Sequence, residues 1–221
     1  MTPLFFRRAA LCALLFAAAC GAPERETAVS SEGDRAAPSD TQRPDMILGA
    51  PDAPVTIIEY ASVTCPGCVQ FNEAIFPALR DKYIETGKAR LIFREFPTPP
   101  AEFSYIGSVL ARCAAEKGGT DAYFAVTDTL LRTQRTWIYG DDPKAELLKV
   151  AGQVGLDGAA FDGCLKRQDL IDLINDGAKE ASETYGVTGT PTFIVNGEKA
   201  ALRTLEAFEA RIEEELANAA N

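Results

Sequence analysis

The chain has 221 residues, with 22 Lys and Arg against 32 Asp and Glu, and it contains six cysteines and no histidine. Without imidazole it cannot form a Ser-His-Asp or Cys-His nucleophile pair or a His-ligated metal site. Its net charge of -10 argues against a nucleic-acid-binding protein, because contact with the phosphate backbone needs clustered cations. The cysteines are therefore the first candidates for chemistry, and we predict no cofactor and no metal.

Residues 1–19 have the pattern of a secretory signal peptide, in which two arginines precede an apolar run. This run is shorter than the roughly 20 residues that a membrane-spanning helix needs. Small residues precede Cys20, as they do where bacterial lipoproteins are cleaved and lipidated, although Ala17 stands where that motif usually has Leu. We therefore expect lipidation at Cys20, with a free secreted form as the alternative.

Residues 20–45 are predicted to form a disordered tether, since from Pro23 onward they contain no Leu, Ile, Phe, Tyr, Trp or Met. Residues 46–221 have the length of one domain.

The domain begins with a predicted strand, helix and strand. Residues 55–61 are β-branched and almost continuously apolar, as in a strand buried on both faces, and residues 91–96 form a similar run. Between them, residues 69–83 carry apolar side chains at helical spacing, and Pro77 is expected to kink that helix. Together these segments predict a βαβ unit.

Residues 98–186 contain no convincing strand, and their apolar spacing predicts short helices around 103–115, 123–131, 145–154 and 170–185. A second β region follows. Residues 192–195 lead into the turn dipeptide Asn196-Gly197 and a short segment over 199–203, the pattern of a hairpin. Thr204 is a candidate N-cap for a last helix. The chain is thus predicted to be an α/β domain whose single sheet is interrupted by a helical insertion.

The sequence Cys65-Pro66-Gly67-Cys68 follows the first buried strand and opens the first helix. A helix N-terminus offers free N–H groups and the positive end of the helix dipole, both of which favour a thiolate. We therefore expect Cys65 to be an exposed thiolate at the cap position, and Cys68 to be a covered resolving thiol.

Two other interpretations of this pair remain open. A zinc half-site would need a second pair of ligands, and Cys113 and Cys164 lie far apart in the sequence. An inert structural disulfide would hardly need so short a link at a turn from strand to helix. A dithiol redox site is the favoured interpretation, because C-x-x-C beside a βαβ pattern is its expected form.

The first strand, the Cys-Pro-Gly-Cys turn and the segment Gly189 to Gly197 resemble the DsbA-like branch of the thioredoxin superfamily over about residues 48–221. The resemblance implies a thioredoxin-like fold with an inserted α-helical subdomain, in which 46–97 and 187–221 form the core and 98–186 form the insertion.

The resemblance also assigns expected roles at the site. It implies that Pro191 is cis and that the backbone of Thr190 pairs with an extended substrate peptide. Glu59 stands where family members carry an acidic residue beneath the active site, and its physical role would be to exchange a proton with Cys68. The alternative for Glu59 is an exposed acid at a strand end.

Some members of the family carry a second disulfide in the insertion, and we expect one between Cys113 and Cys164, with two buried thiols as the alternative. Such a bridge could contribute up to about 4 kcal/mol by loop-closure entropy.

The expected function is that of a periplasm-facing protein thiol-disulfide oxidoreductase, in which the Cys65-Cys68 disulfide exchanges with cysteines of exported proteins through a mixed disulfide at Cys65. The expected partners are reduced or unfolded exported proteins and a membrane redox partner. We expect a monomer that contacts a membrane only through a lipid anchor.

The direction of electron flow is left open. Strongly oxidising family members typically have Pro-His between the cysteines and Val before the cis-proline, where this chain has Pro-Gly and Thr190. Loss of the histidine predicts a weaker oxidant. The first alternative is therefore a reductase or isomerase kept reduced by a membrane donor, and the second is a Cu(I)-binding lipoprotein without catalytic activity.

Overall fold

The computed structural model describes residues 44–220. The predicted signal peptide, Cys20 and nearly all of the predicted tether lie outside the described residues. Within residues 44–220, no helix is both long enough and apolar enough to cross a bilayer.

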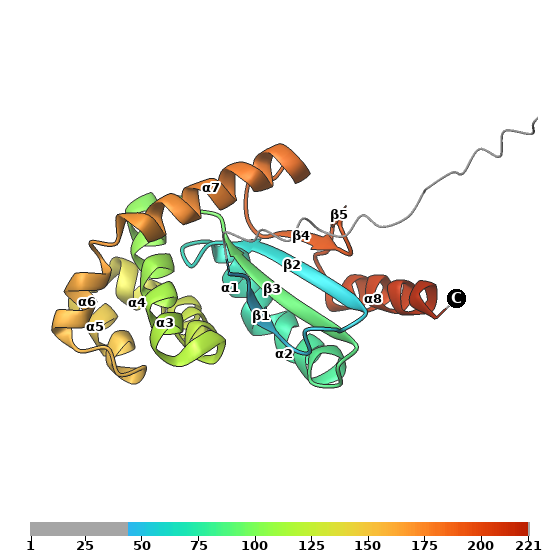
Figure 1. Ribbon diagram of the computed structural model, residues 1–221, viewed down its shortest axis with the longest axis horizontal. Coiled ribbons are helices and arrows are strands. Elements are labelled where there is room, and N and C mark those ends of the chain that lie inside the picture. Colours follow the sequence, from blue (N-terminus) through green and yellow to red (C-terminus); the bar gives the residue numbers. More distant parts are fainter. Residues whose placement is uncertain (1–43, 221) are drawn as a thin grey trace, which may run out of the picture. The chain divides into compact units, whose positions relative to one another are not determined.

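The domain is built on one five-stranded mixed sheet in the order β1-β3-β2-β4-β5 (Figure 1). The central strands β2 and β3 run parallel, and every other neighbouring pair is antiparallel. The strand bounds are β1 Met46–Leu48, β2 Val55–Ala61, β3 Ala89–Glu95, β4 Thr192–Val195 and β5 Glu198–Ala200. The predicted βαβ unit and C-terminal hairpin are both present, whereas the short strand β1 was not predicted.

Strand β2 is buried on both faces, which explains its nearly continuous apolar sequence. Val55 and Ile57 belong to a cluster that reaches Phe208 of the last helix. Ile58 and Tyr60 pack on the opposite face. Since side chains alternate along a strand, Glu59 lies on the same face as Ile57.

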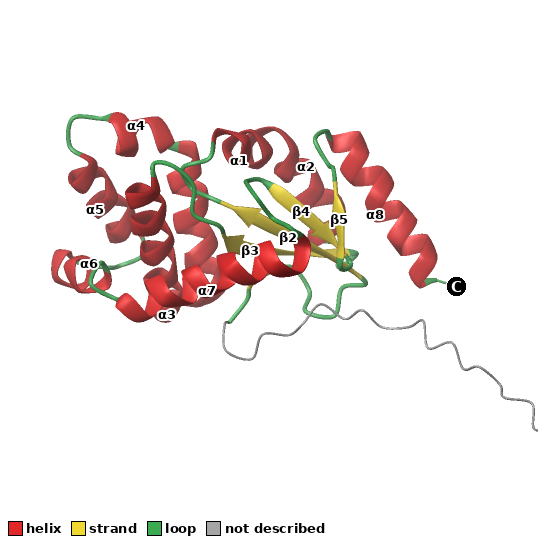
Figure 2. Cartoon of the chain, turned by 90° about the horizontal axis from the view of Figure 1, so that it is seen from above, coloured by secondary structure: helices red, strands yellow, loops and turns green. Residues whose placement is uncertain are grey.

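Helices cover both faces of the sheet. Figure 2 shows α7 (Gln168–Tyr185) on one side and α1 (Pro66–Gln70) with α2 (Phe76–Leu79) on the other. The predicted helix over 69–83 is interrupted by two π-helical turns, η1 (Phe71–Ile75) and η2 (Arg80–Ile84), one on each side of α2. Pro77 lies in the first turn of α2, directly after η1, where the helical stretch changes from π-helical to α-helical turns.

The insertion between β3 and β4 is entirely helical, and most of it gathers at one end of the sheet (Figure 1). The first two predicted helices are both present as the two parts of α3, which are separated at Gly119 by a kink with non-helical backbone angles, φ +71 and ψ -167. Two short helices, α4 and α6, were not predicted. The bounds are α3 Ala101–Arg132, α4 Gln134–Tyr139, α5 Pro143–Gln153 and α6 Gly158–Cys164.

A buried ion pair fastens the insertion to the sheet. Arg112 of α3 donates two hydrogen bonds of 2.6 Å to the carboxylate of Glu95, at the end of β3. The Tyr123 hydroxyl donates a third, of 2.8 Å, to the same carboxylate. Both charged side chains are at most 3% exposed, so the pair is stable only because its hydrogen bonds offset the loss of hydration.

The last helix, α8 (Leu205–Ala219), begins at the predicted cap, where the Thr204 hydroxyl accepts a hydrogen bond from the Ala207 N–H. It follows the hairpin turn, in which Asn196 and Gly197 both have positive φ, as the dipeptide predicts.

Candidate active site

The two cysteines of the Cys-Pro-Gly-Cys turn lie where β2 passes into α1. Cys65 has extended backbone angles and is the N-cap of α1, and its carbonyl accepts hydrogen bonds from the N–H groups of Cys68 and Val69. Cys68, one turn later, is fully buried. Both sulfurs are free, so the structure describes the dithiol form.

The Thr190-Pro191 peptide bond is cis, as the resemblance implies, and its segment lies against the cysteines. The Cys65 thiol donates to the Thr190 carbonyl oxygen 3.2 Å away. A Cβ on Gly67 would lie only 2.9 Å from Pro191 Cδ, so the lack of a side chain permits this approach. The expectation of an exposed Cys65 is wrong, because the residue is only 8% exposed beneath this segment.

The surroundings of Cys65 favour its thiolate. Its pKa is lowered to about 5, first by a hydrogen bond from the Cys68 side chain, with smaller contributions from the Thr190 side chain and nearby backbone N–H groups, while burial opposes the shift. The Thr190 hydroxyl is buried without a hydrogen-bond partner in the dithiol, so it is free to donate to a thiolate. Hydrogen bonds thus take the place of the missing histidine.

Cys68 differs from Cys65, because burial, together with its hydrogen bond to Cys65 and the charge of Glu59, raises the pKa of Cys68 well above its usual range. The two sulfurs are thereby divided into an outer thiolate and an inner thiol.

Glu59 is a buried acid beneath this pair and not an exposed acid at a strand end. It is 3% exposed, and its Oε1 has no hydrogen-bond partner among the described residues. Burial raises the pKa of Glu59 to about 8, and the negative charge of Cys65 adds to the shift. A carboxyl with this pKa can hold or release a proton near neutral pH.

Glu59 also lines a cavity of about 280 Å³ between the sheet, the first helices and α3. Asn72, Asp128 and Arg132 line the same cavity, and Asp128 links the other two by hydrogen bonds of 2.9 Å. The buried carboxyl therefore borders a space large enough for several water molecules.

Buried polar side chains fix the loop before Cys65, and sequence analysis missed them. The Ser62 hydroxyl is 2.8 Å from those of Thr64 and Ser104, and Gln134 of α4 donates to the Val63 carbonyl at 2.9 Å. No sequence signal marks Ser104 or Gln134, since their partners lie 42 and 71 residues away.

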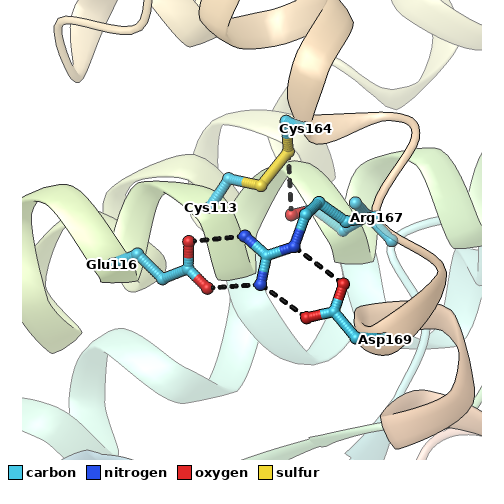
Figure 3. The surroundings of a disulfide bond; sticks show 6 residues. Cys113, Glu116, Cys164, Arg167 and Asp169 are labelled. Carbon is cyan, nitrogen blue, oxygen red and sulfur yellow. Dashed lines mark hydrogen bonds and ion pairs between the residues drawn. A yellow bond between two sulfur atoms is a disulfide. The ribbon is translucent and has the colours of Figure 1, made fainter.

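The other two cysteines join two helices of the insertion. Cys113 of α3 and Cys164 of α6 form a disulfide with a Cα–Cα distance of 6.2 Å. Figure 3 shows Arg167 beside this bond, held in ion pairs with Glu116 and Asp169. The bridge ties α6 to the long helix α3.

The described residues offer no metal site, since among residues 44–220 no three or more His, Cys, Asp or Glu side chains are grouped as ligands. The reactive groups that the structure does bring together are Cys65, Cys68, Glu59, Thr190 and Pro191.

Comparison with known proteins gives the family. The family model described as Thioredoxin matches residues 41–214. Relatives named protein-disulfide oxidoreductase are 30% identical over 178 residues in Rickettsia bellii and 32% identical over 154 residues in Rickettsia typhi. These alignments cover 80% and 69% of this chain, but only 66% and 55% of the relatives' own length.

A crystal structure of alpha-DsbA1 from Wolbachia pipientis has a TM-score of 0.71 and 29% identity, covering 80% of this chain and 92% of that one. Its similarity extends through both the sheet and the helical insertion. The chain therefore belongs to the DsbA-like branch of the thioredoxin superfamily.

Proposed function

We propose that this protein is a thiol-disulfide oxidoreductase that exchanges its Cys65-Cys68 disulfide with cysteines of exported proteins. The observation that carries the proposal is the pairing of a low-pKa Cys65 with a buried Cys68 above the unpartnered carboxyl of Glu59. The names of the relatives and of the Wolbachia neighbour support the same activity.

In the proposed reaction, a substrate thiolate attacks Cys65 Sγ of the oxidised protein. A mixed disulfide forms, and Cys68 leaves as a thiolate that takes a proton from Glu59. A second substrate thiolate then attacks the substrate sulfur of the mixed disulfide, and Cys65 leaves as a thiolate. Two electrons pass from the substrate dithiol to the protein, and the substrate gains a disulfide.

The low pKa of Cys65 favours the oxidising direction, because a stable thiolate is a good leaving group and stabilises the reduced protein. A pKa of about 5 leaves Cys65 nearly all thiolate at pH 7. Because this pKa lies about two units below pH 7, ionisation of Cys65 shifts the exchange equilibrium about 100-fold toward the reduced protein. A tenfold change in this equilibrium corresponds to about 30 mV, so the disulfide becomes more oxidising by roughly 60 mV. The low pKa of Cys65 therefore offsets the prediction of a weak oxidant that the missing histidine suggests.

We further propose that the protein faces the periplasm, anchored through lipidated Cys20, that it is a monomer, and that a membrane redox partner reoxidises it. The signal-like sequence of residues 1–19 supports this location.

The activity is tested by mixing the oxidised protein with a reduced dithiol peptide and following peptide oxidation. Cys65→Ser should abolish the reaction, because no mixed disulfide can then form at position 65. The matched control is Cys113→Ser/Cys164→Ser, which removes the disulfide within the helical insertion and should retain exchange. Full activity of Cys65→Ser would contradict the proposal.

Thiol trapping in cells tests the direction. A mostly oxidised Cys65-Cys68 pair supports substrate oxidation, whereas a mostly reduced pair would favour a reductase or isomerase.

A further inference from the structure

Two surface hollows adjoin each other beside Pro191. One, of about 300 Å³, extends from Gly67 toward the start of α8, and the other, of about 290 Å³, extends from Thr190 toward β5. Both are lined by Pro191, Phe193, Leu202 and Arg203, so they form one groove, which we call the Pro191 groove. It begins beside Cys65, since Gly67 and Thr190 are both neighbours of that sulfur.

The charge of the Pro191 groove is opposite to that of the chain. The sequence has 32 acidic residues, yet no acidic side chain lines either hollow. The two charged residues that do line the groove, Lys199 and Arg203, are both cationic. Its remaining lining is apolar or uncharged, so a carboxylate entering the groove would meet cations and no anion.

Arg203 is the cation that is free to bind. It is exposed, and it forms no ion pair or hydrogen bond with any residue over 44–220. Lys199 is less available, since its ammonium donates to the Gly186 carbonyl at 2.8 Å. Several other arginines, by contrast, form ion pairs with nearby carboxylates, namely Arg80, Arg132, Arg167 and Arg211.

We propose that the Pro191 groove binds a substrate segment carrying an aspartate or glutamate close to its reactive cysteine, with Arg203 as the specificity-determining residue. The inference rests on the proposed thiol-disulfide exchange and adds to it a substrate preference. A peptide paired with the backbone of Thr190 lies along the groove, and its side chains point alternately away from and toward the protein. An acidic side chain there reaches the guanidinium of Arg203, which can bind a carboxylate through two parallel hydrogen bonds.

The net charge of the protein does not override this local preference. At physiological ionic strength, charges are screened beyond about 8 Å, so a bound carboxylate interacts mainly with the cations beside it. An exposed ion pair typically favours the paired state by about 1.4- to 5-fold, and exchanging attraction for repulsion squares this ratio. We therefore expect a selectivity of several-fold rather than a strict requirement.

The test uses three reduced peptides of equal length that differ only in an Asp, Asn or Lys placed next to the reactive cysteine. The readout is the second-order rate of mixed-disulfide formation with the oxidised full chain, measured by acid quenching and mass spectrometry at low salt. Because flanking charge also changes the reactivity of the peptide thiol, each rate is divided by that of the same peptide with oxidised glutathione. After this correction, the wild-type protein should react about fivefold faster with the Asp peptide than with the Lys peptide.

Charge reversal at one position makes the test specific. Arg203→Glu should bring the corrected Asp-to-Lys ratio to one or below, whereas Arg203→Lys should keep it above one. Lys166→Glu is the matched control, since Lys166 is also exposed and unpaired but lies in the insertion, outside the groove. It changes net charge by the same amount and should leave the wild-type ratio intact. The preference should also shrink as salt is raised.

Different outcomes contradict the proposed exchange activity and the proposed preference for an acidic substrate. If the wild-type protein forms no mixed disulfide with any peptide, the proposed activity and this inference are both contradicted. If it reacts with all three peptides at equal corrected rates, or if Arg203→Glu keeps the wild-type ratio, the preference is contradicted while the activity stands. An equal loss of the ratio in Lys166→Glu would assign the effect to net charge and overturn the role of Arg203.

Discussion

Two regions of this domain each contain a buried glutamate and a pair of cysteines, and they use these groups in opposite ways. At the end of β3, Glu95 receives three hydrogen bonds, and Cys113, the residue after its partner Arg112, is bonded to Cys164. On β2, the adjacent strand, Glu59 has an unpartnered carboxyl oxygen beneath two free thiols. The residue types are the same, and their partners differ.

The difference shows what separates a structural carboxyl from a reactive one. Arg112 supplies a counter-ion and two hydrogen bonds to Glu95, and this ion pair holds α3 on the sheet. Glu59 Oε1 has no hydrogen-bond partner among residues 44–220, and burial raises the pKa of Glu59 to about 8. Unsatisfied buried polar groups cost stability, and they concentrate where proton transfer is needed.

The largest expected effect is on stability at the Glu95 region. Arg112→Leu should lower the free energy of unfolding by about 3–5 kcal/mol, because it leaves a buried carboxylate without its counter-ion. Urea unfolding measures this effect. Lys144→Ala, which breaks an exposed ion pair with Asp162, is the control and should cost less than about 1 kcal/mol. Equal losses in the two variants would contradict the structural role of Glu95.

The Cys113-Cys164 disulfide should have the next largest effect. Cys113→Ser/Cys164→Ser opens a link between residues 51 apart and should lower the unfolding free energy by up to about 4 kcal/mol. The pKa of Cys65, measured from thiolate absorbance, should stay near 5 in this variant, because none of the groups that shift this pKa belongs to the bridge. A large shift would show that the two regions are coupled.

Glu59 predicts an effect on stability that depends on pH. In the oxidised protein neither Cys65 nor Cys68 titrates, and burial, the larger cause, still raises the pKa of Glu59. The folded state then holds this proton more tightly than the unfolded chain, whose glutamate has its ordinary pKa of 4.5. Its stabilising contribution is complete below about pH 4.5 and is lost as the pH rises toward 8. Within that window the unfolding free energy should fall by at most about 1.4 kcal/mol per pH unit.

Denaturant unfolding across pH 4 to 9 checks this expectation. Glu59→Gln should remove that dependence, and it should slow the proton-dependent release of Cys68 by about 100-fold, a typical general-acid contribution. An unchanged pH profile in Glu59→Gln would contradict a buried acid of raised pKa.

The sequence predicts the parts of this fold whose signals are local. Residues 55–61 and 192–195 carry strand patterns with the observed bounds, and Thr204 marks the start of α8. Strand β1 has only three residues, and its place depends on pairing with β3, so no local pattern reveals it. The apolar spacing does predict the two helical parts of α3, which are separated by the kink at Gly119.

The candidate site likewise contains residues that the sequence predicts and residues that it does not. The Cys-x-x-Cys spacing and the later Thr-Pro pair lie in short motifs, and the family resemblance adds Glu59 to the predicted site. Burial of Cys65 was not predicted, because it depends on a segment about 125 residues away. Arg203 also carries no local signal, since its significance lies in the lack of acidic side chains among the residues that line the Pro191 groove.

The most direct test of the central claim is to trap the mixed disulfide. In Cys68→Ser the inner thiol is absent, so we oxidise Cys65 with a thiol reagent that leaves a mixed disulfide, add a single-cysteine peptide, and identify the adduct by peptide mapping. The account predicts a stable peptide adduct on Cys65 and none in the matched Cys65→Ser variant. An adduct at Cys113 or Cys164, or no adduct on Cys65, would contradict the assignment of Cys65 as the exchanging sulfur.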